Sequence, residues 1–453
     1  MFKVAELLKA TGGSLVCGQR DIVIKGISID SRTIRLQEAF LAIKGDNFDG
    51  HDFILAAIKK GARCIILKKN YRPLVEFRNV TVIRVNDTAR ALGDIARFQR
   101  EKFNPVVIAV TGSNGKTTTK EMIAKALSSK YRVLKNEGTK NNHIGLPLAL
   151  VKLNQDHDIA VLEIGTNHFG EVDYLAKICR PNIGVITNIG PAHLEYLHSL
   201  AGVLREKYAL IRNLKVPAIA LLNADDKLLR REVLRTGKGA VIFSFGIKQK
   251  GDFSACAIRS GGNKTEFYLK GQGFSLKNLS RHNVYNALAA IGVARLFGVG
   301  YKQISRSLGD FKFPAGRFTL VKRKGITFID DTYNANPLSL NEALQALASL
   351  QPLGRKILVM GDMYELGRSK EAFHRQAGMA LCGICDVFLG AGRLSKLAAQ
   401  SAEKAGFSAK NIFTCQNSLQ ARDILFSRIN PDKNDIILVK GSRKMKMEEV
   451  LKF

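Results

Sequence analysis

The chain of 453 residues has no tryptophan, only seven cysteines and no long apolar segment. So few cysteines in a chain of this length exclude a disulfide-stabilised secreted domain. Cys382 and Cys385 form one CxxC pair without the second pair of a zinc site, so we expect two reduced thiols on a helix. No apolar run approaches the roughly 18 residues of a membrane span. The first segment, MFKVAELLKATGG, predicts a short amphipathic helix instead of a signal peptide, and we expect a cytoplasmic protein.

Acidic residues are scarce relative to basic ones, with 39 Asp and Glu against 70 Lys and Arg and a net charge of +31. An excess of this size favours anionic ligands. The basic residues are spread along the chain and form neither a tail nor a patch interleaved with aromatics, as a nucleic-acid-binding surface would. We therefore expect small anionic ligands and no nucleic-acid partner.

Short β-branched runs alternate with helical stretches through most of the chain. Continuous apolar strands without polar alternation are typical of a parallel sheet buried on both faces, with helices as crossovers. Residues 252–276 differ, because they alternate and hold several glycines, and they predict an antiparallel hairpin inserted before a helix. The apolar runs lie at 64–67, 106–110, 159–165, 183–190, 218–223, 357–362, 387–392 and 436–441.

Two proline-containing junctions divide this α/β pattern. Asn104-Pro105 precedes the strand-like run at 106–110, and a Phe-Pro-Ala-Gly segment at 313–316 precedes a fresh series of strands. Such junctions are typical of domain boundaries. The sequence predicts three α/β domains at 1–103, 104–312 and 313–453.

The strongest local motif is TGSNGKTT at 111–118, between a predicted strand and a predicted helix. Glycines let the loop backbone turn its N–H groups toward a phosphate, at the positive end of the following helix. Lys116 would reach the β- and γ-phosphates, and the Thr117 hydroxyl would bind Mg²⁺. Two residues separate the glycines instead of the usual four. The motif predicts a nucleotide-binding P-loop.

Two further polar residues follow predicted strands. Glu163 ends the run IAVLE, and His193 follows the run IGVITNIG. The carboxyl ends of parallel strands meet at one edge, so Lys116, Glu163 and His193 are expected to converge. Taken singly, each residue also fits an ordinary structural role.

A series of other motifs occurs in a fixed order, and together they resemble the Mur ligases of peptidoglycan precursor synthesis across all three domains. The variants DTYNANP, GDMYELG and NNHIGLP are most similar to members that add D-alanyl-D-alanine to UDP-N-acetylmuramoyl-tripeptide. The segments are TGSNGKTTTKEM, NEGTKNNHIGLP (136–147), LEIGTNHFGEVDYL (162–175), TNIGPAHLEYL (187–197), RHNVYNALAAIGVA (281–294), GRFTL (316–320), DDTYNANPLSL (330–340), LVMGDMYELG (358–367) and LVKGSR (438–443).

The resemblance implies an ATP-dependent amide ligase. ATP would phosphorylate the terminal carboxylate of a UDP-linked peptide, and the amine of D-Ala-D-Ala would attack the acyl phosphate. It also implies a UDP-sugar-binding first domain, a central P-loop ATPase domain and a Rossmann-like C-terminal domain that closes on ATP and the dipeptide. Thr117 and Glu163 would hold one Mg²⁺, and His193 with a carbamoylated Lys207 a second, because a carbamate is an anion whereas an ammonium repels the metal.

The same resemblance assigns site residues, in a protein we expect to be monomeric. The catalytic set is Lys116, Glu163, His193 and Lys207. The ATP-binding set is Gly112, Ser113, Asn114, Gly115, Lys116, Thr117, Thr118, Asn283, Asn286, Arg317 and Asp331. The substrate-binding set is Asp30, Ser31, Arg32, Lys44, Thr139, Asn141, Asn142, Tyr333, Asn334 and Asn336. The residue types alone are also compatible with ordinary structural roles. The asparagines of 281–294 could cap a helix, residues 30–31 could form a turn, and Lys207 could lie on a solvated helix face.

Other functions stay open at this point. A ligase that adds the third peptide residue is the runner-up, although the diaminopimelate-adding members carry Asp-Asn-Pro-Arg where this chain has the segment 361–367. Folylpolyglutamate synthase fits less well, since it has no UDP-binding domain of the kind that the DSR and GDNFDGHDF motifs suggest. A nucleic-acid-binding ATPase or a nucleotide-binding protein without catalysis would share the P-loop but not the full motif series.

Overall fold

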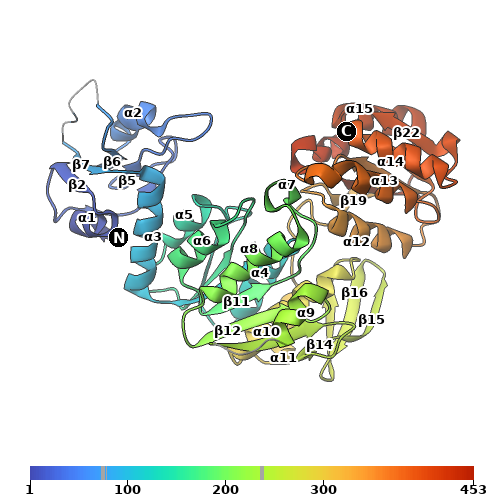
Figure 1. The fold of residues 1–453 in the computed structure, drawn as a ribbon, viewed down its shortest axis with the longest axis horizontal. Coiled ribbons are helices and arrows are strands. Elements are labelled where there is room, and N and C mark those ends of the chain that lie inside the picture. The colour runs from blue at the N-terminus through green and yellow to red at the C-terminus, as the bar shows by residue number, and fades with distance from the viewer. Residues whose placement is uncertain (73–76, 78, 235–238) are drawn as a thin grey trace.

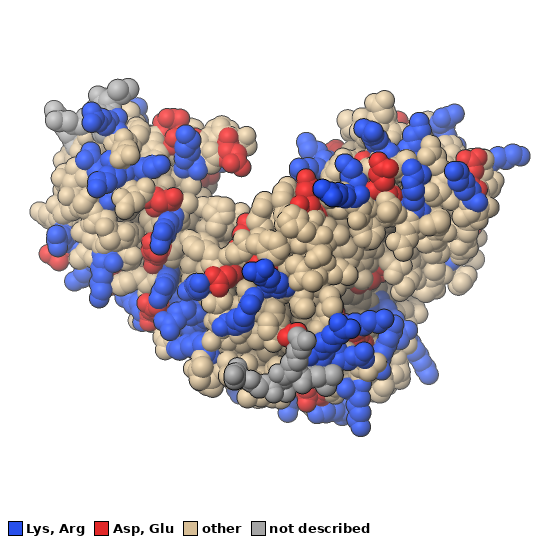
Figure 2. Space-filling model, in the orientation of Figure 1, with Lys and Arg blue, Asp and Glu red and all other residues tan. Residues whose placement is uncertain are grey.

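The computed structural model describes residues 1–72, 77, 79–234 and 239–453, and the chain has three α/β domains. In Figure 1 the N-terminal and C-terminal domains rise from opposite sides of the central domain. Figure 2 shows a wide concavity between them and Lys and Arg side chains on all three domains of this face. The boundaries at 103/104 and 312/313 stay predictions; they fall at the end of helix α3 (Thr88–Phe103) and after α11 (Tyr301–Gly309).

The N-terminal domain is built on a sheet of strand order β2-β7-β6-β5-β4, in which only the edge pair β2–β7 is antiparallel. A short antiparallel pair, β1 with β3, lies beside it, and the amphipathic N-terminal helix predicted from the sequence is confirmed as α1 (Val4–Thr11). The strands are β1 (Phe2–Lys3), β2 (Ser14–Cys17), β3 (Val23–Ile24), β4 (Ile27–Ser28), β5 (Ala39–Leu41), β6 (Cys64–Lys68) and β7 (Thr81–Val85); helix α2 spans Ile54–Lys59.

The central domain holds the long parallel sheet that the continuous apolar runs predict, in the order β14-β13-β12-β11-β8-β10-β9. Every residue of β10 and β11 is buried, because helices cover both faces. The strands are β8 (Val106–Thr111), β9 (Val133–Lys135), β10 (Ile159–Glu163), β11 (Ile183–Ile186), β12 (Ala218–Asn223), β13 (Ala240–Gly246) and β14 (Phe253–Ser254). The helices are α4 (Lys116–Leu127), α5 (Gly145–Leu150), α6 (Glu171–Cys179), α7 (Leu194–Leu197), α8 (Leu200–Arg212), α9 (Lys227–Leu234), α10 (His282–Leu296) and α11.

The hydrophobic core joins the first two domains. Leu92 and Ile95 of α3 belong to one buried cluster with Leu7 of α1 and Val172 of α6. Helix α3 therefore packs on both domains, as Figure 1 shows. On the other face of the central sheet, α4, α10 and α11 share a second cluster. No helix among the described residues is long and apolar enough to cross a membrane.

The antiparallel insertion predicted at 252–276 is a three-stranded meander instead of a hairpin. It comprises β15 (Cys256–Gly261), β16 (Lys264–Leu269) and β17 (Gln272–Leu276), whereas Phe253–Ser254 forms the parallel edge strand β14. Tight turns at Gly262 and Gly271, both with positive φ, let the chain reverse twice.

The C-terminal domain has a second mostly parallel sheet, in the order β18-β19-β23-β20-β21-β22, with only β18 antiparallel to its neighbour. Its strands are β18 (Thr319–Arg323), β19 (Ile326–Asp331), β20 (Lys356–Gly361), β21 (Val387–Ala391), β22 (Ile412–Cys415) and β23 (Ile436–Lys440). Its helices are α12 (Pro337–Ala348), α13 (Lys370–Met379), α14 (Arg393–Lys404) and α15 (Ser418–Ile424), with short 3₁₀ or π turns at 367–369, 409–411, 425–429, 443–445 and 447–451.

The CxxC pair does not lie on a helix, so that prediction is wrong. Cys382 and Cys385 are free thiols in a turn between α13 and β21. Helix α13 ends at Met379, before the pair, and Gly383, with φ +75°, lies in the turn that follows.

Helices α13 and α14 approach so closely at Gly378 that a Cβ there would lie 2.0 Å from the Ala398 carbonyl oxygen. We expect Gly378→Ala to lower the free energy of unfolding by about 1–3 kcal/mol, because α14 must shift, although alanine is the better helix former. Met379→Ala, at a neighbouring exposed position, is the matched control. Thermal unfolding checks this, and an unchanged midpoint for Gly378→Ala would contradict the packing.

Candidate active site

The predicted P-loop lies between β8 and α4 and is fixed from behind by β11 and the segment after it. The Thr187 hydroxyl donates to the Asn114 carbonyl oxygen (2.5 Å), and the Ser113 hydroxyl donates to that of Gly190 (3.0 Å). Gly112 has φ +147°, and a Cβ there would lie 1.9 Å from the Thr187 Oγ1. Only glycine fits this close approach, which explains the first glycine of the motif.

Lys116, the first residue of α4, folds over the loop. Its Nζ donates to the carbonyl oxygens of Gly112 (2.8 Å) and Ser113 (3.1 Å). Burial and the Arg317 guanidinium lower the pKa of Lys116, and the Glu163 carboxylate opposes them. The ammonium is therefore positioned where a loop-bound phosphate would stabilise its charge.

Glu163 stands at the carboxyl end of β10 and is 1% exposed. One carboxylate oxygen, Oε1, accepts a hydrogen bond from the Asn141 amide at 2.6 Å. The other, Oε2, is buried without a hydrogen-bond partner among the described residues. A buried carboxylate oxygen without a partner is costly, so this atom indicates a place for a ligand.

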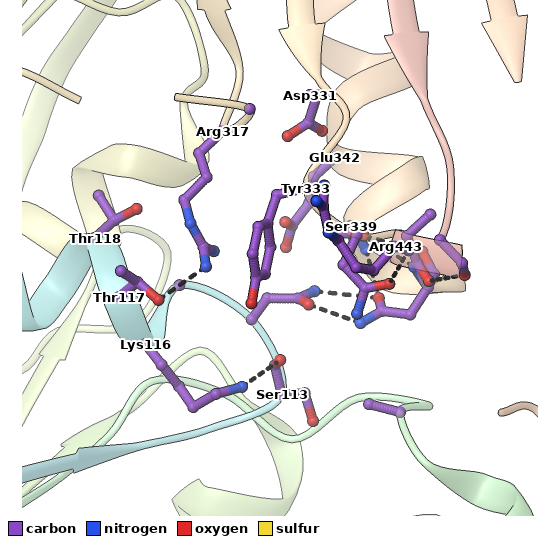
Figure 3. Close-up of a pocket in the computed structure, with 18 of the residues that line it drawn as sticks. Ser113, Lys116, Thr117, Thr118, Arg317, Asp331, Tyr333, Ser339, Glu342 and Arg443 are labelled. Carbon is purple, nitrogen blue, oxygen red and sulfur yellow. Dashed lines mark hydrogen bonds between the residues drawn. The ribbon is translucent and has the colours of Figure 1, made fainter. Parts of the chain in front are cut away.

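The P-loop, Glu163 and His193 line one cavity of about 330 Å³, as their positions at strand ends predict. Its opposite wall comes from the C-terminal domain, and Figure 3 shows the two walls facing each other. Most of the predicted ATP set lines this cavity, together with part of the substrate set. The predicted residues in it are Ser113, Asn114, Gly115, Lys116, Thr117, Thr118, Asn141, Glu163, His193, Asn283, Asn286, Arg317, Asp331, Tyr333, Asn334 and Asn336.

The C-terminal wall already touches the P-loop. The Arg317 guanidinium donates to the Thr117 hydroxyl at 2.8 Å and lies over the Tyr333 ring, 4.1 Å from its centroid (Figure 3). The side-chain amides of Asn336 and Asn114 are in contact at 2.7 Å. A guanidinium beside the P-loop adds positive charge where phosphates would lie.

Asn283 and Asn286 take part in a chain of polar contacts that crosses the central domain. The Asn286 amide donates to Asn283 (2.8 Å) and accepts from the Thr119 hydroxyl (3.1 Å), and the Asn283 amide donates to Asn278 (2.8 Å). Asn278 in turn donates to the Phe318 carbonyl oxygen (2.7 Å). Neither residue caps α10; they connect α4, α10 and the start of the C-terminal domain while lining the cavity.

Lys207 lies on α8 and is 1% exposed. It is therefore a buried lysine and not part of a solvated helix face. Burial and the nearby Lys116 ammonium lower its pKa well below the ordinary value, and Glu206 opposes them. Lys207 is not among the described residues that line the cavity. Burial lowers the pKa of His193, the Glu365 carboxylate raises it, and the charges of Lys207 and Lys116 lower it further.

The remaining predicted residues lie elsewhere. Asp30 and Arg32 of the N-terminal domain pair with each other at 2.8 Å, and this hydrogen bond lowers the pKa of Asp30 to about 2. The described cavity lining also omits Gly112, Ser31, Lys44, Thr139 and Asn142. Asn142 accepts from the Gly145 N–H at 2.8 Å, so it stabilises the start of α5.

Several cavity residues were not predicted, although most of them lie in or next to the motifs quoted above. Glu365 contacts the His193 Nδ1 at 2.6 Å, and Glu342 contacts the His282 Nδ1 at 2.9 Å. Lys440, 2% exposed in its side chain, pairs with Asp331 at 2.6 Å. Arg443 and Lys444 add positive charge on the C-terminal wall. Each contact joins segments far apart in the sequence, so no local spacing signals it.

In this chain a P-loop faces a second α/β domain across a polar, positively charged cavity. This arrangement is typical of multidomain enzymes that use a nucleotide. Family models agree: the Mur ligase family catalytic domain matches residues 23–100, the Mur ligase middle domain 110–294, and the Mur ligase glutamate ligase domain 316–443. The chain belongs to the Mur ligase family.

Curated relatives and solved structures cover nearly the whole chain. Proteins named UDP-N-acetylmuramoyl-tripeptide--D-alanyl-D-alanine ligase are 35% identical in Bacillus subtilis (99% of this chain, 96% of that protein) and 36% identical in Escherichia coli (95% and 94%). MurF from Acinetobacter baumannii is 33% identical with a TM-score of 0.89 (99% of this chain, 98% of that chain). MurF ligase from Thermotoga maritima in complex with ADP is 32% identical with a TM-score of 0.81 (96% and 97%).

The His282–Glu342 pair joins α10 of the central domain to α12 of the C-terminal domain. Burial alone would lower the pKa of His282, but the carboxylates of Glu342 and Asp331 outweigh it and hold that pKa above its ordinary value. The pair therefore stabilises the fold fully below about pH 6.5, the pKa of an unfolded histidine, and this contribution is lost as the pH rises through the folded pKa.

We expect Glu342→Gln to lower the thermal midpoint at about pH 6, by an amount equivalent to about 1–2 kcal/mol, and to have less effect at about pH 9. Glu403→Gln, at an exposed carboxylate on α14, is the control. A Glu342→Gln effect that is equal at both pH values would contradict a charged His282.

Proposed function

We propose that this chain is an ATP-dependent ligase that joins D-alanyl-D-alanine to UDP-N-acetylmuramoyl-tripeptide and so makes the pentapeptide precursor of peptidoglycan. The relatives that carry this name span the whole chain, and one similar structure holds ADP. The observation that carries the proposal is one cavity in which a P-loop, a buried carboxylate and a cationic C-terminal wall face each other.

ATP would bind with its phosphates on the P-loop. The loop N–H groups and Lys116 would hold the β- and γ-phosphates at the N-terminus of α4, while Thr118 and Ser113 line the same space. Arg317 would move its guanidinium from the Thr117 hydroxyl to the terminal phosphate. Asn283, Asn286 and Asp331 surround the side of the cavity proposed for the base and ribose.

The residues present fit Mg²⁺. The Thr117 hydroxyl and the unpartnered Glu163 Oε2 are hard oxygen donors of the kind this ion prefers, and both line the cavity. His193 and a carbamate on Lys207 would hold a second ion. When bound, the ions would neutralise phosphate charge and draw electrons from the reacting centre.

The proposed reaction has two steps. An oxygen of the peptide carboxylate attacks the γ-phosphorus of ATP, the bond to the β-phosphate oxygen breaks, and ADP leaves with an acyl phosphate formed. The neutral amine of the dipeptide then attacks the acyl carbon, phosphate leaves with its bonding electron pair, and the proton that the amine loses passes to the released phosphate as the amide forms. Lys116 and Arg317 stabilise the negative charge that gathers on the transferred phosphate.

The N-terminal domain, residues 1–103, would bind the UDP-sugar through Asp30, Ser31, Arg32 and Lys44. Thr139, Asn141 and Asn142 would face the diphosphate and sugar from the central domain, residues 104–312. Tyr333, Asn334 and Asn336 of the C-terminal domain, residues 313–453, would contact the dipeptide. The concavity between the outer domains offers a path for a ligand that reaches from the first domain to the cavity (Figure 2).

The function is tested by measuring phosphate release with ATP, Mg²⁺ and UDP-N-acetylmuramoyl-tripeptide, with and without D-Ala-D-Ala. We expect release that depends on the dipeptide and a product heavier by one dipeptide less water. Lys116→Ala should abolish release, because the P-loop loses its ammonium, whereas Lys125→Ala, at an exposed position on α4, should not. Release with a single amino acid and a shorter precursor would instead favour the ligase that adds the third residue.

Lys207 offers the chemistry that carbamoylation needs. Only a neutral amine attacks CO₂, and the lowered pKa of this buried lysine favours the neutral form. The carbamate would then replace an ammonium by an anion beside Lys116 and His193.

We expect Lys207→Ala to reduce turnover by about 100-fold and added formate or acetate to restore part of it, since a short carboxylate can take the place of the carbamate. Wild-type protein in ¹³C-bicarbonate should show a carbamate carbon signal by NMR that Lys207→Ala lacks. Arg205→Ala, at an exposed cation on the same helix, is the control. Full activity in Lys207→Ala would show that Lys207 has no role in the reaction.

A further inference from the structure

His193 belongs to the central domain, yet the C-terminal domain holds its side chain. The His193 Nδ1 and the Glu365 Oε2 are 2.6 Å apart across 172 positions of sequence, and both side chains are mostly shielded, at 17% and 29% exposure. A backbone hydrogen bond joins the same two segments, in which the Glu195 N–H donates to the Glu365 carbonyl oxygen at 3.1 Å. A side-chain and a backbone contact therefore fix the two loops together.

Both loops have unusual backbones at the point of contact. His193 has φ +55° and Glu365 has φ +62°, values that non-glycine residues rarely adopt. Two positions further, Gly367 comes so close to the other loop that a Cβ would lie 3.3 Å from the Glu195 Cα. Left-handed backbone at non-glycine residues persists where the surrounding contacts enforce it, and such residues cluster at functional sites.

The contact determines the chemistry of the imidazole. A carboxylate accepts only from a protonated ring nitrogen, so Glu365 keeps the proton of His193 on Nδ1 and leaves the lone pair on Nε2. A carboxylate on the far nitrogen of a ligating histidine fixes the ring orientation and makes the other nitrogen a better donor. His193 lines the same cavity as Lys116 and Glu163.

We propose that Glu365 is a positioning residue, by which the C-terminal domain orients His193 and makes the catalytic centre complete only when that domain is docked. This inference rests on the proposed function, in which His193 would hold the second metal ion. The C-terminal domain, which is expected to bind the dipeptide, thereby also contributes a residue that orients a side chain of the catalytic centre.

The test compares Glu365→Gln and Glu365→Asp with Glu195→Gln, whose exposed carboxylate lies on the His193 loop and whose backbone contact is retained. We expect Glu365→Gln to lower kcat by about 10–100-fold, with the KM for ATP and for the UDP-linked peptide within about twofold of wild type. Glu365→Asp should recover part of the loss, and Glu195→Gln should behave as wild type. A purely structural role would instead raise KM and lower the thermal midpoint together.

A second measurement is independent of activity. The chain has eight histidines, so ¹⁵N-histidine labelling gives a short list of ring signals, and His193→Asn identifies that of His193. We expect wild type to show His193 protonated on Nδ1, Glu365→Gln to lose that preference, and Glu195→Gln to keep it.

A wild-type kcat in Glu365→Gln, or an unchanged His193 ring signal in that variant, would overturn the proposal. If the wild-type protein does not ligate the dipeptide at all, the proposed function fails, and the ring signals still decide whether Glu365 orients His193.

Discussion

Positive charge held below the surface at the carboxyl edge of the central sheet is the constraint on which the site depends. Lys116 and Arg317 line the cavity together, and burial and the Arg317 guanidinium lower the pKa of Lys116. Glu163 is the carboxylate that opposes them at Lys116. Like charges gathered away from water are costly unless anions join them, so the cavity is built to receive a polyanion.

The parallel sheet explains why these groups meet. Strands β8, β10 and β11 are adjacent and run in one direction, so the P-loop, Glu163 and the His193 loop all start from the same edge. The C-terminal domain then faces that edge and contributes Arg317 and Glu365 to it. The cavity is lined by both domains, and neither encloses it alone.

Sequence patterns predicted the parts of this arrangement that depend on local order. The apolar runs predicted the inner strands β8, β10, β11 and β12 of the central sheet and β20, β21 and β23 of the C-terminal sheet, but not the other strands of either sheet. The P-loop, Glu163 and His193 followed from strand-end positions. The contacts of Glu365 and Lys440 were missed because they join segments more than a hundred residues apart, and only packing brings these together. The helix expected at Cys382 is absent, because α13 already ends at Met379 and the pair lies in the turn before β21.

The central claim is that the cavity forms an amide through an acyl phosphate, and the fate of one oxygen atom tests it most directly. UDP-N-acetylmuramoyl-tripeptide with ¹⁸O in its terminal carboxylate would be ligated to D-Ala-D-Ala, and the released phosphate analysed by mass spectrometry. The account predicts one ¹⁸O atom in each phosphate, because the carboxylate oxygen that attacks phosphorus leaves with it. Phosphate free of ¹⁸O, formed together with the ligated product, would contradict it.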